Sequence, residues 1–166
     1  LFDDEALYVG VTCHDSQPGG VIARERRRDI VARDEPLRDD DHFEIVLDTF
    51  HDHRNGYHFA INPLGTQYDA QVRNEGRPDA TWDASWDVRT SVTESGWTAE
   101  FRIPLRTLRY GPAPQTWGMN AFRNIQRRRE RTYWAPLDLV YSLQRVSAAG
   151  DLRALQLKTP RNLKVL

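Results

Sequence analysis

The chain has 166 residues, of which 39% are hydrophobic and 28% are charged, and its formal net charge is −1 at pH 7. This length suits one domain with a hydrophobic core. The near-neutral charge gives no general attraction to nucleic acids, so nucleic acid binding is not expected despite two short arginine runs. The chain has one cysteine, Cys13, which excludes an internal disulfide bond.

The first expected strand covers residues 7–13 and has its apolar side chains, including Cys13, on one face. Because it starts so near the first residue, an earlier edge strand is predicted to be missing from this sequence. Residues 24–34 are rich in charge and lack a clear period, which predicts an irregular, solvent-facing segment or a short helical turn.

A β-hairpin is predicted at the centre of the chain. Residues 42–48 and 57–62 alternate apolar and polar side chains, and an Asn-Gly pair lies between them. One face carries Phe43, Ile45 and Leu47 and is expected to be buried. The opposite, polar face is expected to be in solvent, and its side chains are the first candidates for ligand binding: Glu44, His58 and Asn62.

Further strands are expected at residues 66–72, 86–92, 97–103, 117–125, 133–135 and 150–157, with one helical turn at 105–108. Eight or nine short strands without a long amphipathic helix predict an all-β fold, an antiparallel two-sheet β-sandwich resembling a jelly roll. Residues 1–158 are assigned to this domain, and residues 159–166 to the start of a linker to a following domain.

Aromatic and acidic side chains supply further candidate sites. Trp97 and Trp117 share faces with core residues, whereas Trp82 and Trp86 lie in or beside a polar loop and could be exposed stacking platforms. Clustered carboxylates are stabilised by a hard cation, so structural calcium is the metal considered. Its candidate ligands are Asp39, Asp40, Asp41, Asp48 and Asp52. No haem is expected, because Met119 occupies a core position. Without a nucleophile, phosphate or metalloprotease motif, no catalysis is expected.

The ordered segments of the chain resemble one known family. They are LYVGVTCHD, then DDDHFEIVLDTFHDHRNGYHFAINPLGTQYD, then GWTAEFRIPLRTLRY, WGMNAFRN and GDL. Together they are similar to a family 9 carbohydrate-binding module, of the subgroup that precedes an outer-membrane β-barrel in bacterial envelope proteins. The resemblance implies a β-sandwich, non-catalytic carbohydrate binding and structural calcium. It also implies export to the periplasm, the outer membrane or the cell exterior.

The resemblance also indicates which sugar-contacting positions this chain keeps. Glu44 is retained, whereas an aromatic position is occupied by Arg38 and a basic position by Ala60. A second aromatic position falls at Leu143, or at Tyr141 if one gap is allowed. A competing interpretation follows from these replacements: the domain has lost sugar binding and docks against its own C-terminal membrane barrel or another partner.

Overall fold

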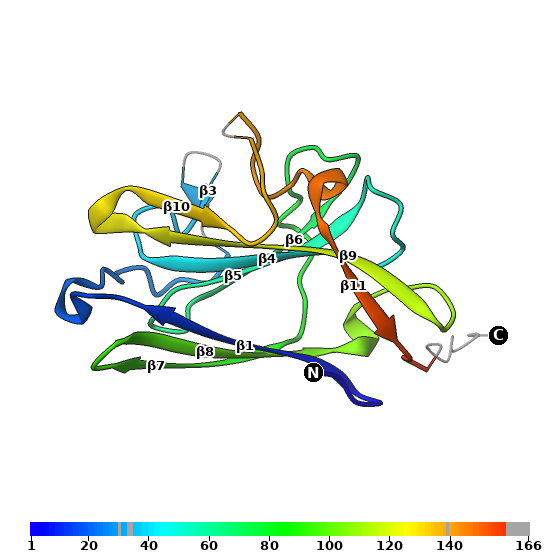
Figure 1. The fold of residues 1–166 in the computed structure, drawn as a ribbon, viewed down its shortest axis with the longest axis horizontal. Coiled ribbons are helices and arrows are strands. Elements are labelled where there is room, and N and C mark those ends of the chain that lie inside the picture. Colours follow the sequence, from blue (N-terminus) through cyan, green and yellow to red (C-terminus); the bar gives the residue numbers. More distant parts are fainter. Residues whose placement is uncertain (30, 33–34, 139, 159–166) are drawn as a thin grey trace.

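The structure is a computed structural model that describes residues 1–29, 31–32, 35–138 and 140–158. These residues form eleven β-strands and four short 3-10 turns, and none of the described segments is a helix long and apolar enough to cross a membrane. Two antiparallel sheets pack face to face (Figure 1). The predicted all-β two-sheet sandwich is therefore confirmed.

The smaller sheet has three strands in the order β1-β8-β7. They are β1 (Ala6–His14), β8 (Gly96–Pro104) and β7 (Asp87–Thr93). The tight β7–β8 turn requires glycine at position 96, where φ is +137° and a Cβ atom would collide with the Cys13 carbonyl oxygen. All three strands lie within two residues of the predicted boundaries.

The larger sheet has the order β10-β9-β4-β5-β6, and β11 pairs with the other half of the long strand β9. Its strands are β4 (His42–Asp48), β5 (Gly56–Ile61), β6 (Gln67–Val72), β9 (Gln115–Ile125), β10 (Glu130–Tyr133) and β11 (Gly150–Leu155). The predicted hairpin is β4–β5, with Ile45 opposite Phe59. It lies at the centre of the sheet, because β9 flanks β4 on its other side.

Two features of the chain differ from the expected elements. The charged segment 24–34 contributes β2 (Val31–Ala32), which pairs with β3 (Glu35–Pro36) as a small separate ribbon. The strand expected at 133–135 is instead β10, which ends at Tyr133. The expected helical turn is confirmed as η2 (Leu105–Thr107), and the other 3-10 turns are η1 (Pro18–Gly20), η3 (Gln126–Arg128) and η4 (Val146–Ala148). The proposed linker, 159–166, lies outside the described residues.

The main hydrophobic core fills the space between the two sheets. Ile45 and Leu47 on β4 are fully buried there, and Phe43 packs against the same cluster at its margin. Trp97 and Trp117 are also fully buried, as their positions predicted. Cys13 is buried as expected, and burial raises the pKa of its thiol to about 11, so it stays protonated and unreactive.

The outer face of the larger sheet is covered as well. One apolar cluster joins Val46 and Phe122 to Leu143 and Val146 of the connection between β10 and β11. A second cluster joins Ala60 and its neighbours on β5 and β6 to Leu37, beside β3. In Figure 1 both covering segments lie above the larger sheet, on the side away from the smaller one. The domain therefore has a second buried layer where the sequence predicted a solvated surface.

Candidate functional site

Glu44 lies at the centre of a buried polar cluster on the outer face of β4. One carboxylate oxygen, Oε1, is 3.0 Å from Nε2 of His42, and the other, Oε2, is 2.6 Å from Nε2 of His58. His42 reaches Glu44 because the two residues are two positions apart on one strand, and His58 reaches it from the neighbouring strand β5. Both oxygens of Glu44 are thus occupied by partners within the protein.

The cluster changes the ionisation of its members. Burial acts to raise the pKa of the Glu44 carboxyl, but the His58 charge and the hydrogen bonds of both histidines outweigh it and lower that pKa from 4.5 to about 2. Burial acts to lower the pKa of His42, yet its bond to Glu44 outweighs this effect and raises that pKa above 6.5. The cluster is therefore held together by charge as well as by hydrogen bonds.

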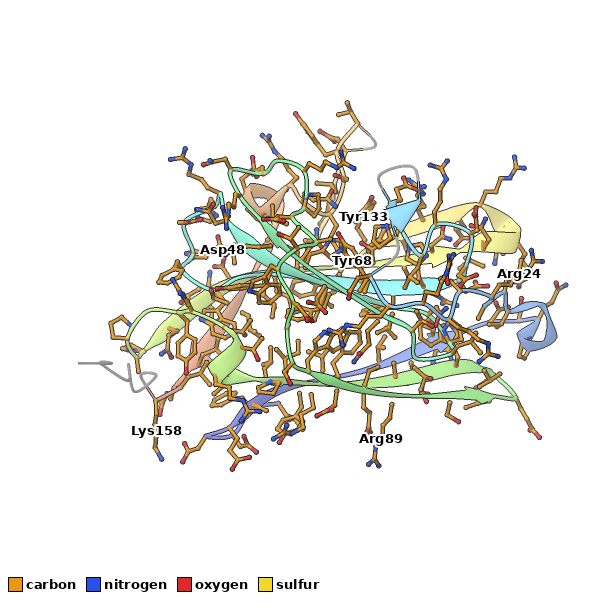
Figure 2. The ribbon with its side chains drawn as sticks, turned by 180° about the vertical axis from the view of Figure 1, so that it is seen from behind. Arg24, Asp48, Tyr68, Arg89, Tyr133 and Lys158 are labelled. Atoms are coloured by element: carbon orange, nitrogen blue, oxygen red, sulfur yellow. The ribbon has the colours of Figure 1, made fainter. Side chains whose placement is uncertain are left out.

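The predicted exposure of the polar face is wrong. Glu44 is 5% exposed, and His58 and Asn62 have no exposed surface. The predicted faces of the strand are correct, because the side chains of Glu44 and Ile45 point to opposite faces of the sheet. The face that carries Glu44, however, is covered by the apolar layer described above. Tyr68 and Tyr133 also lie over this part of the sheet (Figure 2). Direct contact between a ligand and Glu44 or His58 would require this covering layer to open.

Asn62 and Asp40 have a different role, because they fix the loop formed by residues 24 and 25. Asp40 accepts hydrogen bonds from the backbone N–H groups of Arg24 and Glu25, each at 2.9 Å, and from the Asn62 side chain at 2.8 Å. Asn62 also donates to the Glu25 carbonyl at 2.8 Å, and Thr66 donates to the same carbonyl at 2.6 Å. These contacts hold the loop against the start of β4.

The loop forms one wall of a cavity of about 380 Å³. The described residues that line it are Arg24, Glu25, Arg27, Leu37, Arg38, Asp39 and Asp40. This volume lies at the small end of the roughly 300–1,000 Å³ range of ligand pockets. Most of the lining side chains are polar, and their hydrogen-bonding groups could bind hydroxyl or anionic groups. Arg38 and Asp39 were discussed from the sequence, whereas the residues 24–27 were interpreted only as a charged surface.

The five aspartates proposed as calcium ligands do not converge on one point. Asp41 accepts from the backbone N–H groups of Ile22 and Gln126, and Asp48 accepts from those of Asp52 and His53. Asp52 caps the turn that follows it, and Asp48 lies at the end of the larger sheet away from Arg24 (Figure 2). Asp40 accepts three hydrogen bonds, as described above, and Asp39 is exposed. The described structure therefore does not gather these five aspartates into one calcium site, and the carboxylates of all but Asp39 are instead used to fix turns and loops.

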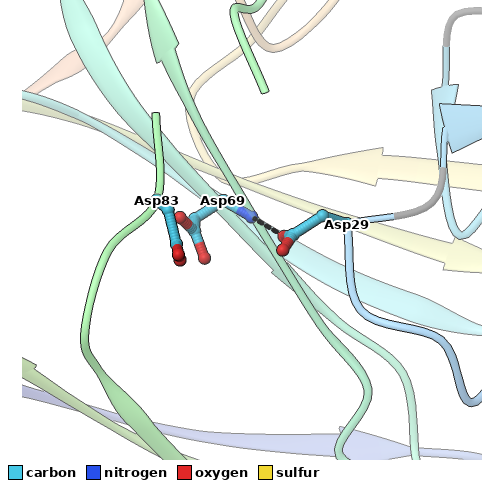
Figure 3. Close-up of side chains that lie close together, drawn as sticks. All are labelled: Asp29, Asp69 and Asp83. Atoms are coloured by element: carbon cyan, nitrogen blue, oxygen red, sulfur yellow. Dashed lines mark hydrogen bonds between the residues drawn. The ribbon is translucent and has the colours of Figure 1, made fainter. Parts of the chain in front are cut away.

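A different group of three carboxylates does come together. Oxygens of Asp29, Asp69 and Asp83 lie within 4.8 Å of one another (Figure 3). The guanidinium of Arg28 is bonded to all three, at 3.0 Å from Asp29, 2.5 Å from Asp69 and 3.3 Å from Asp83. Asp69 is fully buried and also accepts from the Trp86 indole and the Ala84 backbone. The arginine thus supplies the positive charge that the carboxylates require.

The aromatic candidates are placed differently from the prediction. Trp86 is 4% exposed and stacks on Phe101 within the main core, so it is not a surface platform. Trp82 is half-buried against Tyr57. Tyr141 is 42% exposed, with the Arg145 guanidinium 4.6 Å from its ring centre. Trp134 is 58% exposed. The alternation of side chains along a strand could not predict this exposure, because Trp134 follows the end of β10.

The fold and the cavity define a β-sandwich binding domain. The family model described as carbohydrate family 9 binding domain-like matches residues 1–135, which is most of the sequence. The chain therefore belongs to this family, whose members are non-catalytic binding domains. No curated protein sequence shows significant similarity to the chain.

Solved structures share this fold at low sequence identity. A carbohydrate-binding module of family 9 from Caldicellulosiruptor kristjanssonii in complex with cellotriose is 19% identical, with a TM-score of 0.58, covering 100% of this chain and 76% of that one. The glucose complex of a family 9 module from the same organism is 18% identical, with a TM-score of 0.62 and coverages of 97% and 75%. A structure described as a putative carbohydrate-binding protein from Bacteroides uniformis is 15% identical, with a TM-score of 0.63 and coverages of 80% and 67%.

Proposed function

We propose that this domain binds a carbohydrate, without catalysis, in the cavity beside the start of β4. The cavity itself carries the proposal, because it is lined mainly by charged residues and is large enough for a small ligand, in a domain of a carbohydrate-binding family. Glucose and cellotriose in the related modules support this class of ligand. Asn62 then supports the cavity from behind, since with Asp40 it holds the cavity wall.

Asp39 is the side chain that tests this placement most directly. It lines the cavity, is exposed, and forms no hydrogen bond with any other described residue, so its substitution should not affect folding. Its carboxylate can accept hydrogen bonds from sugar hydroxyl groups, and such bonds to a charged group are the stronger kind. Asp39→Asn should therefore weaken sugar binding about fivefold to tenfold.

The experiment is a calorimetric titration with a broad panel of neutral and acidic mono- and disaccharides. Asp87→Asn is the matched control, because Asp87 is exposed on β7 of the opposite sheet. Binding that Asp39→Asn weakens and Asp87→Asn preserves supports the proposal. If no sugar of the panel binds at millimolar concentration, the proposal fails.

A second candidate function is docking to a protein partner, including the barrel expected to follow in the same polypeptide. The observation that favours it is the apolar surface of the connection between β10 and β11, where Trp134 is 58% and Val140 is 82% exposed. When the domain and the rest of the polypeptide are expressed as separate chains, Trp134→Ser with Val140→Ser should then abolish their co-purification, while sugar binding by the domain persists.

Export to the cell envelope is also proposed. It is tested by fractionating cells that express the full-length protein.

A further inference from the structure

We infer that the preferred ligand of the cavity is an acidic sugar, one that carries a carboxylate or a sulfate ester. This inference rests on the proposed function and specifies the chemical class of its ligand. Three of the seven described lining residues are arginines, and none of the seven is aromatic. A neutral sugar is commonly held by an aromatic ring that stacks on its apolar face, and this cavity supplies no such ring.

The acidic side chains of the cavity are mostly occupied by other groups. Glu25 forms a two-point ion pair with Arg27, at 3.0 Å and 2.9 Å, and accepts two backbone hydrogen bonds as well. Asp40 is 2% exposed and accepts the three hydrogen bonds that fix the loop. Neither carboxylate is therefore available to pair with the other two arginines, Arg24 and Arg38.

Among the residues that the structure describes, Arg24 and Arg38 keep hydrogen-bond donors that no other side chain uses. No other residue in the described ranges forms an ion pair or a hydrogen bond with the guanidinium of Arg24. Arg38 approaches Glu35 only at 3.7 Å, which is too long for a hydrogen bond. Both oxygens of Glu35 already accept from Arg131, at 2.9 Å and 3.0 Å. The cavity therefore presents two arginines with unused donors.

Charge and geometry together favour an anionic group. The lining holds three arginines and three carboxylates, so its formal charge is zero. Glu25 is paired with Arg27, and Asp40 faces the N–H groups of the loop and of Asn62, so Arg24, Arg38 and Asp39 are the charged groups left to face a ligand. A guanidinium binds a carboxylate or a sulfate through two parallel N–H···O bonds. Asp39 can meanwhile accept from ring hydroxyls. An acidic sugar satisfies all three side chains, whereas a neutral sugar leaves the arginines without an anion.

The test compares matched sugars in calorimetric titrations at low ionic strength: glucose with glucuronate and glucose 6-sulfate, and galactose with galacturonate. We expect at least one acidic sugar to bind about tenfold or more tightly than its neutral parent, and less tightly as sodium chloride is added. The two arms, carboxylate and sulfate, show which anion the site prefers. Sodium acetate at matched concentration shows whether the sugar ring is required.

Variants connect the preference to the cavity. Arg24→Met and Arg38→Met should each reduce the preference for the acidic sugar about tenfold, whereas Arg89→Met, on the far sheet in Figure 2, should leave it unchanged. Equal binding of neutral and acidic sugars overturns the inference and leaves the proposed function standing. Competition by acetate as strong as by the acidic sugar also overturns it. If no sugar binds in any arm, both the inference and the proposed function fail.

Discussion

At the scale of single residues, the ion cluster of Glu44 is the most sensitive point in the domain. Glu44→Gln keeps the size of the side chain but removes the charge that two buried histidines face. Breaking a buried ion pair by neutralising one partner typically costs about 3–5 kcal/mol. We expect a loss of about 3 kcal/mol in the free energy of unfolding, measured by urea denaturation.

A matched substitution at an exposed position separates the effect of the buried ion pair from the effect of the Glu→Gln change itself. Glu100→Gln makes the same change at an exposed position of β8 and should alter the free energy of unfolding by less than about 0.5 kcal/mol. Equal effects of the two substitutions would show that the histidine contacts of Glu44 add nothing to stability.

The same cluster makes stability depend on pH. The pKa of Glu44 is lowered from 4.5 to about 2 in the folded state, so its stabilisation is complete above pH 4.5 and is lost as the pH falls toward 2. The pKa of His42 is raised above 6.5, so its stabilisation is complete below pH 6.5 and is lost as the pH rises through the folded value. The two effects coincide between pH 4.5 and 6.5.

Urea denaturation at pH 5.5 and 8.5 tests this dependence. The difference in unfolding free energy between the native chain and Glu44→Gln should be larger at pH 5.5 than at pH 8.5. A difference that stays constant between the two pH values, or that grows at pH 8.5, contradicts the assigned shift of His42.

For single residues, the sequence predicted correctly which face of the sheet each side chain of β4 points to, but it did not predict whether that face is exposed to solvent. The period of two placed Glu44 opposite Ile45, since neighbouring side chains of a strand point to opposite faces. It gave no information on what covers the outer face, because the covering residues, such as Leu37 and Leu143, come from other parts of the chain. Trp86 was misassigned for a similar reason: its indole bonds to Asp69, a distant residue that parity does not indicate.

At the scale of elements, Arg28 joins three segments that are far apart in the sequence. Its guanidinium bonds Asp29, Asp69 on β6 and Asp83 in the connection to β7. Arg28→Met should cost about 2–4 kcal/mol in unfolding free energy, because the fully buried Asp69 loses its ionic partner. Chemical denaturation measures the loss.

Arg153→Met serves as the control, because Arg153 pairs with Asp151 at the surface with 77% of its side chain exposed. Surface ion pairs contribute about 0–1 kcal/mol, so this variant should be nearly as stable as the native chain. If Arg28→Met is as mild as the control, the three carboxylates do not depend on the arginine.

The strands themselves were largely predictable. The hairpin β4–β5 followed from alternation and an Asn-Gly turn, both of which are local signals. The ribbon β2–β3 was missed because each of its strands has two residues, too few to show a period. The strand at β10 was expected too late in the chain, because an aromatic-rich stretch has a high β propensity. The strand ends at Tyr133, although the Trp134 N–H still donates to the Ala121 carbonyl of β9.

At the scale of the whole molecule, the candidate site could not be predicted from any one element. The cavity combines a loop at 24–27, the segment 37–40 and the anchoring Asn62 at the end of β5. The sequence singled out Asp40 as one of a group of aspartates and Asn62 as part of the polar face of the hairpin, but it did not connect the two residues. Their hydrogen bonds to the backbone of Arg24 and Glu25 are long-range contacts that depend on the complete fold, so the site appears only when the chain is assembled.

The main core joins both sheets, and this predicts one cooperative unfolding transition. Leu47 on β4 is fully buried in the cluster that also contains Phe101 of β8 and Trp97, so shortening it weakens the contact between the two layers. Leu47→Ala should cost about 3 kcal/mol, whereas Val92→Ala, at a position 58% exposed on β7, should cost less than about 0.5 kcal/mol. Tryptophan fluorescence and far-ultraviolet circular dichroism should report the same shifted midpoint. Separate midpoints for the two signals would mean that the sheets unfold independently and that this core does not couple them.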